Sequence, residues 1–156
     1  MSQVFLILHN LRSVHNVGSI FRTADAAGVT KIYLVGCTPT PIDRFGRVRK
    51  DMAKVALGAE TSMPWEYCRQ INVLLRALRA QKLSIVAVEQ DKHSVDYRTF
   101  KPKKAVAFIL GNEVTGIPKG VLALCDTIVE IPMHGKKESL NVSVSAGIVL
   151  FQYAKH

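Results

Sequence analysis

Strand-like and helix-like segments alternate along the chain, and this alternation constrains the fold more than any other feature of the sequence. Apolar runs typical of buried strands cover 4–8, 31–35, 84–88, 105–110 and 127–131. Helical periodicity is found over 17–27, 47–58, 71–82 and 142–154. Strands that alternate with helices are joined by right-handed crossovers and pair in parallel. The sequence therefore predicts an α/β fold, with a mostly parallel sheet flanked by helices.

The chain has 156 residues, 48% of them hydrophobic, which predicts one compact domain over residues 1–156. No apolar run approaches the roughly 18 residues that span a bilayer, and the first residues predict a strand and not a signal peptide. Cys37, Cys68 and Cys125 are odd in number and widely spaced, which argues against disulfides and zinc and predicts a cytoplasmic protein. The histidines lack metal-ligand spacing, so no metal is expected.

Positive charge is in excess, with 21 Lys and Arg against 12 Asp and Glu, giving a formal net charge of +9. Such an excess favours a polyanionic partner, usually a nucleic acid, although charge alone also fits ordinary solubility. The cations are clustered in two places, which strengthens the first interpretation. The residues expected to bind RNA are Arg44, Arg47, Arg49 and Lys50 in one segment, and Lys101, Lys103 and Lys104 in another.

The C-terminal stretch combines a strand, a polar loop and an apolar helix. The strand-like run 127–131 stops at Pro132, and Ser139 and Asn141 are both candidates to cap the helix that follows. That helix, 142–154, is apolar on nearly every side, so it is buried in the core or against another subunit. The small residues Ser143 and Gly147 lie one turn apart and allow a close approach. Spacing alone favours an ordinary β-loop-α connection.

A second loop, 111–116, begins and ends with glycine and directly follows the strand-like run 105–110. Ligands of open α/β sheets bind at the carboxyl ends of strands, which is where this loop lies. It lacks the G-x-G-x-x-G and P-loop patterns, and the chain lacks G-x-S-x-G, which argues against three common nucleotide and hydrolase sites. On spacing alone, a solvated turn with Glu113 pointing into water is the simpler interpretation.

Three stretches taken together closely resemble the three motifs of the SpoU-type RNA 2′-O-ribose methyltransferases, a branch of the SPOUT superfamily. They are Asn-Val-Gly-Ser-Ile-Phe-Arg-Thr-Ala-Asp-Ala-Ala-Gly at 16–28, Phe-Ile-Leu-Gly-Asn-Glu-Val-Thr-Gly at 108–116, and the segment 131–147 with its Ser-Leu-Asn at 139–141. The segment 54–60 is similar to that family too. The first motif departs from it in opening with Ser13-Val-His15, where a proline often stands.

The resemblance implies a SPOUT fold whose C-terminal part forms a deep trefoil knot. It implies S-adenosylmethionine as methyl donor, held by the loops 110–116, 131–135 and 139–141. The cofactor-binding residues are then Leu110, Gly111, Asn112, Glu113, Gly116, Ile131, Met133, Ser139 and Leu140. It also implies tRNA or rRNA as substrate, and a homodimer in which Arg22 completes the active site of the opposite subunit.

The same resemblance assigns catalytic roles to five residues: Arg22, Asn16, Glu113, Ser139 and Asn141. Because a guanidinium stays protonated in proteins, we expect Arg22 to stabilise negative charge on the ribose oxygen and not to act as a base. Its alternative role is a surface pair with Asp25 at i+3. Asn16 is expected to cap its helix and organise the Arg22 site. Glu113 is expected to hold Arg22 or Asn16 across the interface.

Three functions remain compatible with these residues. The first is the RNA ribose 2′-O-methyltransferase, favoured by the Ser-Leu-Asn motif and by the presence of all five catalytic candidates. The second is a catalytically silent, knotted RNA-binding module. The third is a knotted methyltransferase that acts on a base nitrogen. The sequence does not identify the RNA, and because no separate RNA-binding extension is recognised, the target is expected to be selected by surface shape and charge or by a partner.

Overall fold

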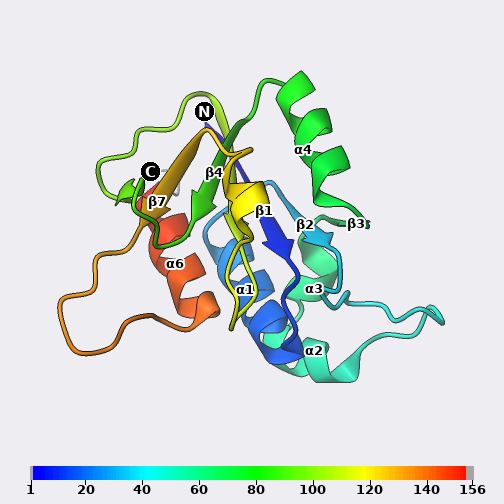
Figure 1. Ribbon diagram of the computed structural model, residues 1–156. Helices are drawn as coiled ribbons and strands as arrows, with labels where there is room; N and C mark the ends of the chain where they lie inside the picture. Colours follow the sequence, from blue (N-terminus) through cyan, green and yellow to red (C-terminus); the bar gives the residue numbers. More distant parts are fainter. Residues whose placement is uncertain (1, 154–156) are drawn as a thin grey trace.

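The computed structural model describes residues 2–153 and contains a seven-stranded sheet with helices on both faces (Figure 1). The elements in chain order are β1 (Gln3–His9), α1 (Val14–Ala26), β2 (Lys31–Val35), α2 (Lys50–Ala56), α3 (Ala59–Ser62), β3 (Trp65–Cys68), α4 (Ile71–Ala80), β4 (Ser84–Val88), β5 (Val95–Asp96), β6 (Ala105–Leu110), α5 (Lys119–Leu122), β7 (Thr127–Glu130) and α6 (Val142–Tyr153). The strand order is β3-β2-β1-β6-β4-β7-β5, and the pairings are parallel. The predicted α/β fold is confirmed.

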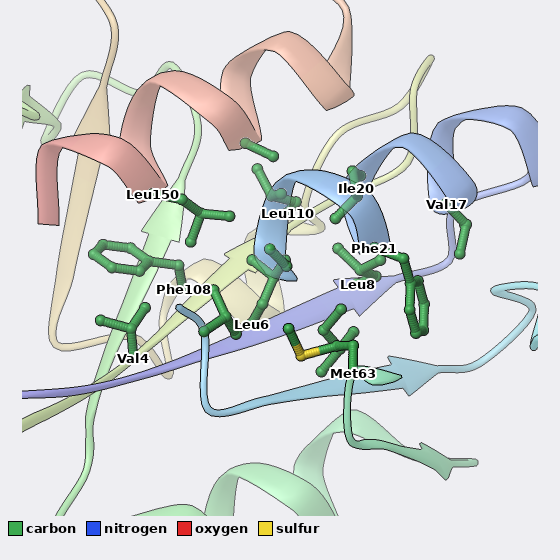
Figure 2. Close-up of a cluster of buried hydrophobic side chains, with 14 of the residues drawn as sticks. Val4, Leu6, Leu8, Val17, Ile20, Phe21, Met63, Phe108, Leu110 and Leu150 are labelled. Atoms are coloured by element: carbon green, nitrogen blue, oxygen red, sulfur yellow. The ribbon is translucent and has the colours of Figure 1, made fainter. Parts of the chain in front are cut away.

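Each central strand is buried on both faces and supplies two hydrophobic clusters. In β6, Phe108 and Leu110 belong to the cluster beneath α1 and α6, whereas Ile109 belongs to the cluster beneath α4. Figure 2 shows the first cluster, with Ile20 and Phe21 of α1 and Leu150 of α6 lying over β1 and β6. Alternate residues of a strand point to opposite faces, so a strand covered on both sides reads as a continuous apolar run. This is why the sequence located these strands correctly.

The helix α1 begins three residues earlier than expected. The Ser13 hydroxyl accepts a hydrogen bond from the backbone N–H of Asn16 at 3.1 Å, so Ser13 is the N-cap. The prediction that Asn16 caps this helix is therefore wrong, and Asn16 lies inside the first turn. Its side chain is thereby free to be used elsewhere. The apolar stripe itself was predicted correctly: Val17, Ile20, Phe21 and Ala24 are buried.

Three short elements, α3, β3 and β5, were not predicted. β3 has four residues, is half-exposed and lies at the sheet edge, and it is a strand because it pairs with β2 and not because of a local pattern. The helix predicted over 47–58 is shorter, because α2 covers Lys50–Ala56 and ends at Leu57 in a left-handed conformation. The last helix begins at Val142 as expected, and its predicted last residue, Ala154, lies outside the described residues.

The order β4-β7-β5 places the last strand of the chain between two earlier ones. The strand β7 therefore pairs with both β4 and β5, and the connection that joins β4 to β5 crosses from one side of β7 to the other. This insertion is consistent with the trefoil knot that the resemblance implies, and the threading itself stays a prediction. The helix α6 that follows buries Ala146, Val149 and Leu150 but exposes Val144 and Phe151, so it is only partly covered within one chain.

Candidate functional site

A cavity of about 770 Å³ opens at the carboxyl ends of β4, β6 and β7. Its walls come from the loops that follow these strands and from the start of α6. The lining includes all nine residues predicted to bind a cofactor: Leu110, Gly111, Asn112, Glu113, Gly116, Ile131, Met133, Ser139 and Leu140. Parallel strands bring loops that are distant in sequence to one edge of the sheet, so the topology alone explains this assembly.

The loop 111–116 requires glycine at both ends. A Cβ on Gly111 would lie 2.6 Å from the backbone carbon of Gly116, and a Cβ on Gly116 would lie 2.3 Å from Oε2 of Glu89. Gly116 also has a φ of 69°, a conformation that side chains with a Cβ rarely adopt. The backbone therefore folds back on itself closely, and its polar groups reach the cavity wall without a bulky side chain between them.

Asn112 holds this loop in shape from within. Its Oδ1 accepts hydrogen bonds from the backbone N–H groups of Val114 at 2.9 Å and Thr115 at 3.0 Å. Its Nδ2 donates to the backbone oxygen of Asn10 at 2.9 Å, just beyond the end of β1. The glycine-bounded loop is thus tied to the neighbouring strand end and presented as a fixed surface.

Glu113 binds the start of α1. Its carboxylate accepts hydrogen bonds from the backbone N–H groups of Arg12, at 3.0 Å to Oε2, and Ser13, at 3.0 Å to Oε1. Partial burial is the largest single influence on its pKa and raises it, but the hydrogen bonds from the backbone N–H groups of Ser13, of Glu113 itself and of Arg12, and from the Asn16 side chain, together outweigh it. The pKa of Glu113 is therefore lowered, and the carboxylate is charged.

The Asn16 side chain joins the three motifs. Its Nδ2 donates to Oε1 of Glu113 at 3.3 Å, and its Oδ1 accepts a hydrogen bond from Nδ2 of Asn141 at 3.2 Å. The resulting series Glu113–Asn16–Asn141 links the loop after β6, the first turn of α1 and the start of α6. The Asn16 that Glu113 holds belongs to the same chain, so the expectation that this contact crosses a subunit interface is corrected.

Of the two predicted caps of α6, Asn141 is the one the helix uses. Its Oδ1 accepts a hydrogen bond from the backbone N–H of Ser143 at 2.9 Å, while its Nδ2 is engaged with Asn16. Ser139 makes no hydrogen bond among residues 2–153 and lines the cavity instead, so its prediction as a helix cap is wrong. Its hydroxyl is left available to a bound molecule.

Arg22 lies outside the cavity of its own chain. It is exposed on α1, beyond the Asn16 turn, and is absent from the cavity lining. Within the described part of the chain it forms no ion pair with Asp25, which instead accepts a hydrogen bond from the Ser62 hydroxyl at 3.5 Å. The alternative role of Arg22 in an i, i+3 surface pair is therefore not observed.

The two cationic clusters lie at opposite ends of the strands: the arginine cluster at their carboxyl ends and the lysine cluster at their amino ends. Arg44, Arg47 and Arg49 line a separate hollow beyond the carboxyl ends of β2 and β3, and Lys50 follows as the first residue of α2. Lys101, Lys103 and Lys104 are exposed before β6, where the backbone oxygen of Lys104 accepts a hydrogen bond from the N–H of Gln3. Only the first cluster shares an edge with the cavity.

The sequence interpretation missed Glu89, Gln90 and Asp91, which also line the cavity. The Glu89 carboxylate accepts hydrogen bonds from the backbone N–H groups of Ile117 at 3.0 Å and Gln90 at 2.9 Å. The bond from Ile117 ties the end of the glycine loop to the residue that follows β4. Its position directly after the strand 84–88 was the available signal, because residues there lie at the ligand-binding edge.

The described residues contain neither a cluster of metal-ligating side chains nor a membrane-spanning helix. No group of three or more His, Cys, Asp or Glu side chains within residues 2–153 is placed to hold a metal ion. None of the helices in the same range combines the length and the apolar character needed to cross a bilayer.

The parallel sheet and the three-motif cluster beside its cavity define an α/β protein with a ligand site at the carboxyl edge. Residues 3–151 match the SpoU rRNA Methylase family, and the chain belongs to this family. It is 35% identical over 147 residues to the 23S rRNA (guanosine-2'-O-)-methyltransferase RlmB of Neisseria meningitidis, with 94% of this chain and 56% of that protein covered.

Two further similarities agree with this assignment. The chain is 32% identical over 145 residues to the tRNA (guanosine(18)-2'-O)-methyltransferase of Escherichia coli, covering 93% of this chain and 60% of that protein. It is 32% identical to the AdoMet-bound rRNA methyltransferase of Sinorhizobium meliloti, whose crystal structure superimposes with a TM-score of 0.87 over 96% of this chain and 55% of that one. The chain thus spans little more than half the length of these relatives.

Proposed function

We propose that this chain is an S-adenosylmethionine-dependent methyltransferase that modifies a ribose 2′-hydroxyl of tRNA or rRNA. The observation that carries this proposal is the hydrogen-bonded series Glu113–Asn16–Asn141 beside the cavity, because it unites the three motifs in one polar cluster. The names of the relatives, guanosine 2′-O-methyltransferases of rRNA and tRNA, support the same reaction. The three free cysteines agree with a cytoplasmic protein.

The cavity suits S-adenosylmethionine in size and in the chemistry of its lining. Its apolar residues, such as Leu110, Ile131 and Leu140, can pack against an adenine ring, and the close approach of Gly111 to Gly116 exposes backbone groups for hydrogen bonds. The carboxylates of Glu89, Asp91 and Glu130 line the same space and complement a cofactor that carries a sulfonium and an ammonium group. The volume of about 770 Å³ lies in the range of ligand pockets.

Bound S-adenosylmethionine would supply an electrophilic methyl group for in-line displacement by the ribose 2′-oxygen, with S-adenosylhomocysteine as the leaving group and the hydroxyl proton released to water. The contribution of this chain is to position the ribose and stabilise the charge that grows on its 2′-oxygen. Ser139 and Asn141 lie where they can hold the ribose at the cavity mouth. We assign the stabilising positive charge to Arg22, since a guanidinium donates hydrogen bonds but does not accept a proton at neutral pH.

Because Arg22 lies outside the cavity of its own chain, we propose that it acts in the cavity of a second copy. The exposed apolar residues of α6, Val144 and Phe151, support an interface on the side where α6 packs beside α1. Phe151→Asp should then convert a dimer into a monomer in light-scattering and sedimentation measurements. Val73→Asp, on the exposed face of α4, is the matched control and should leave the assembly unchanged. A wild-type monomer would refute the shared site.

Methyl transfer from tritiated S-adenosylmethionine to total RNA tests the activity directly. Digestion of the labelled RNA should release nuclease-resistant dinucleotides, because a 2′-O-methyl group blocks cleavage at the adjacent phosphate. Label recovered only in mononucleotides would indicate the base-nitrogen reaction instead, because a methylated base does not protect the adjacent phosphate. Binding of RNA without incorporation of label would identify the chain as a silent RNA-binding module.

A further inference from the structure

A small hairpin, residues 42–48, projects from the segment that joins β2 to α2, the cyan loop at the right of Figure 1. Ile42 and Val48 form an antiparallel bridge at its base, and the backbone N–H of Asp43 donates to the oxygen of Arg47 at 2.8 Å. The Asp43 carboxylate accepts hydrogen bonds from the N–H groups of Phe45 at 2.8 Å and Arg47 at 3.0 Å. The hairpin tip is thus held in shape by its own residues.

An exposed aromatic ring stands at this tip between two arginines. Phe45 is 66% exposed, and the guanidinium carbons of Arg44 and Arg47 lie 4.8 Å and 5.0 Å from its ring centroid. Arg47 is fixed by Asp43, with its Nε 3.1 Å from Oδ2, whereas Arg44 has no ion pair within residues 2–153. Aromatic rings and guanidinium planes are the surfaces on which unpaired bases stack.

Beside the hairpin lies a hollow of about 770 Å³ that contains two further aromatic residues, Trp65 and Tyr67 of β3. The Tyr67 hydroxyl donates to the backbone oxygen of Gly36 at 2.9 Å, which fixes its half-exposed ring. Three arginines and two aspartates line the hollow, and the aspartates, Asp43 and Asp51, each pair with an arginine. The remaining positive charge suits a phosphate.

The hollow communicates with the cofactor cavity along the carboxyl edge of the sheet. It shares Cys37 with an intermediate hollow of about 420 Å³, which Asn10 and Arg12 also line. That hollow in turn shares Asn112 and 114–116 with the cofactor cavity. With strands about 4.8 Å apart, the hairpin hollow and the cofactor cavity are separated by on the order of 15 Å. A single strand a few nucleotides long covers this distance.

We propose that the hairpin hollow binds an unpaired nucleotide of the substrate RNA, stacked on Phe45, a few positions from the methylated ribose. This inference rests on the proposed function for the identity of RNA as substrate, and it adds that the substrate is a loop or a single strand and not a continuous duplex. The arginines packed around Phe45 favour a polyanion over a protein partner at this exposed apolar tip.

Trp65 is the only tryptophan of the chain and lies in this hollow, so its fluorescence reports binding without any need for methyl transfer. Titration with a short unstructured RNA should quench it, and a blunt RNA duplex of the same length should leave it nearly unchanged. If the wild-type protein transfers no methyl group yet shows this quenching, the proposed activity fails and the nucleotide site stands. Equal responses to both RNAs would overturn the site.

Two substitutions at the tip separate stacking from mere apolar contact. Phe45→Leu keeps an apolar side chain without a ring and should weaken binding of the unstructured RNA about tenfold, whereas Phe45→Tyr should restore it. Val73→Ala, an exposed apolar position on α4, is the control and should bind as the wild type. Unchanged affinity in Phe45→Leu contradicts the proposal. A changed oligomeric state in that variant would instead assign the hairpin to a protein interface.

Discussion

Asn16 shows how much of the site depends on one buried amide. Its side chain is 9% exposed, its Nδ2 donates to Glu113 and its Oδ1 accepts from Asn141. Both polar atoms of the buried amide therefore have a hydrogen-bond partner. No other side-chain type of similar size both donates and accepts in this fork, which explains why an asparagine suits this turn of α1. The cap role that the sequence assigned to it is carried by Ser13, and this frees the amide for the site.

Loss of the Arg22 guanidinium should separate cofactor binding from catalysis. Arg22→Ala should bind S-adenosylmethionine nearly as the wild type does, because Arg22 lies outside the cavity lining, but methyl transfer should fall about 10²- to 10³-fold. Calorimetry measures the first quantity and tritium incorporation the second. Arg76→Ala, on the exposed surface of α4, is the control. Wild-type turnover in Arg22→Ala would show that another group stabilises the ribose oxygen.

The charge of Glu113 should appear in the pH dependence of stability. Its pKa is lowered below the ordinary value of 4.5, so its contribution to folding is complete above about pH 4.5 and is lost as the pH falls through the lowered value. The free energy of unfolding of the wild type should therefore decrease with acidification in that window. In Glu113→Gln this part of the decrease should be missing.

Urea denaturation at a series of pH values measures the difference between the two proteins. Asp43 and Asp96 also have lowered pKa values, but the wild type and Glu113→Gln both retain these two residues. The difference between the two stability curves therefore isolates Glu113. Glu138→Gln is the matched control, because within residues 2–153 the Glu138 carboxylate accepts no hydrogen bond. Parallel curves for the wild type and Glu113→Gln would show that the backbone donors of Arg12 and Ser13 do not favour the charged form.

At the scale of elements, the glycine loop after β6 offers a comparison of two glycines. Gly116→Ala forces a Cβ to within 2.3 Å of the Glu89 carboxylate at a φ of 69°. We expect a loss of about 1–3 kcal/mol in the free energy of unfolding and weaker binding of S-adenosylmethionine. Gly120→Ala in α5 meets no atom within 4 Å and should leave binding unchanged. Denaturation and calorimetry on both variants check this, and equal behaviour would contradict a fixed loop.

The elements also show what sequence reasoning can reach. Strands buried on both faces, such as β2 and β6, were predicted with their observed bounds, because a continuous apolar run has one explanation in a parallel sheet. Edge strands such as β3 and β5 carry no such run and exist through pairing with their neighbours. The start of α1 was misplaced because Ser13 and Asn16 are both good caps, and local sequence does not choose between them.

At the scale of the whole molecule, the sheet order explains why the site residues could be predicted from the sequence, whereas the contacts between them could not. The resemblance supplied the residues predicted to bind the cofactor, and the topology gathers them at the carboxyl ends of the strands. The link from Glu113 through Asn16 to Asn141 spans 125 residues of sequence, and no periodicity encodes such a contact. The position of Glu89 directly after the strand 84–88 could be read from the sequence, but its contact with Gly116 could not.

The two cationic clusters should contribute to RNA binding in different ways, because they lie at opposite ends of the strands. The six-residue strand β6 places these two ends roughly 20 Å apart. The arginine cluster, on the edge of the cavity, should hold the RNA segment near the target. The lysine cluster at the opposite edge should hold a more distant part. We therefore expect replacement of Arg44, Arg47 and Arg49 by Gln to weaken binding of both a complete tRNA and a short stem-loop.

Replacement of Lys101, Lys103 and Lys104 by Gln changes the net charge by the same amount and is the matched comparison. It should weaken binding of the complete tRNA only, since a short stem-loop does not reach both edges. For each phosphate that a variant no longer neutralises, the slope of log affinity against log salt should fall by about 0.7–0.9. Fluorescence anisotropy over a salt series measures these slopes. If the lysine variant binds the stem-loop as weakly as the arginine variant does, non-specific charge and not the position of the clusters governs RNA binding.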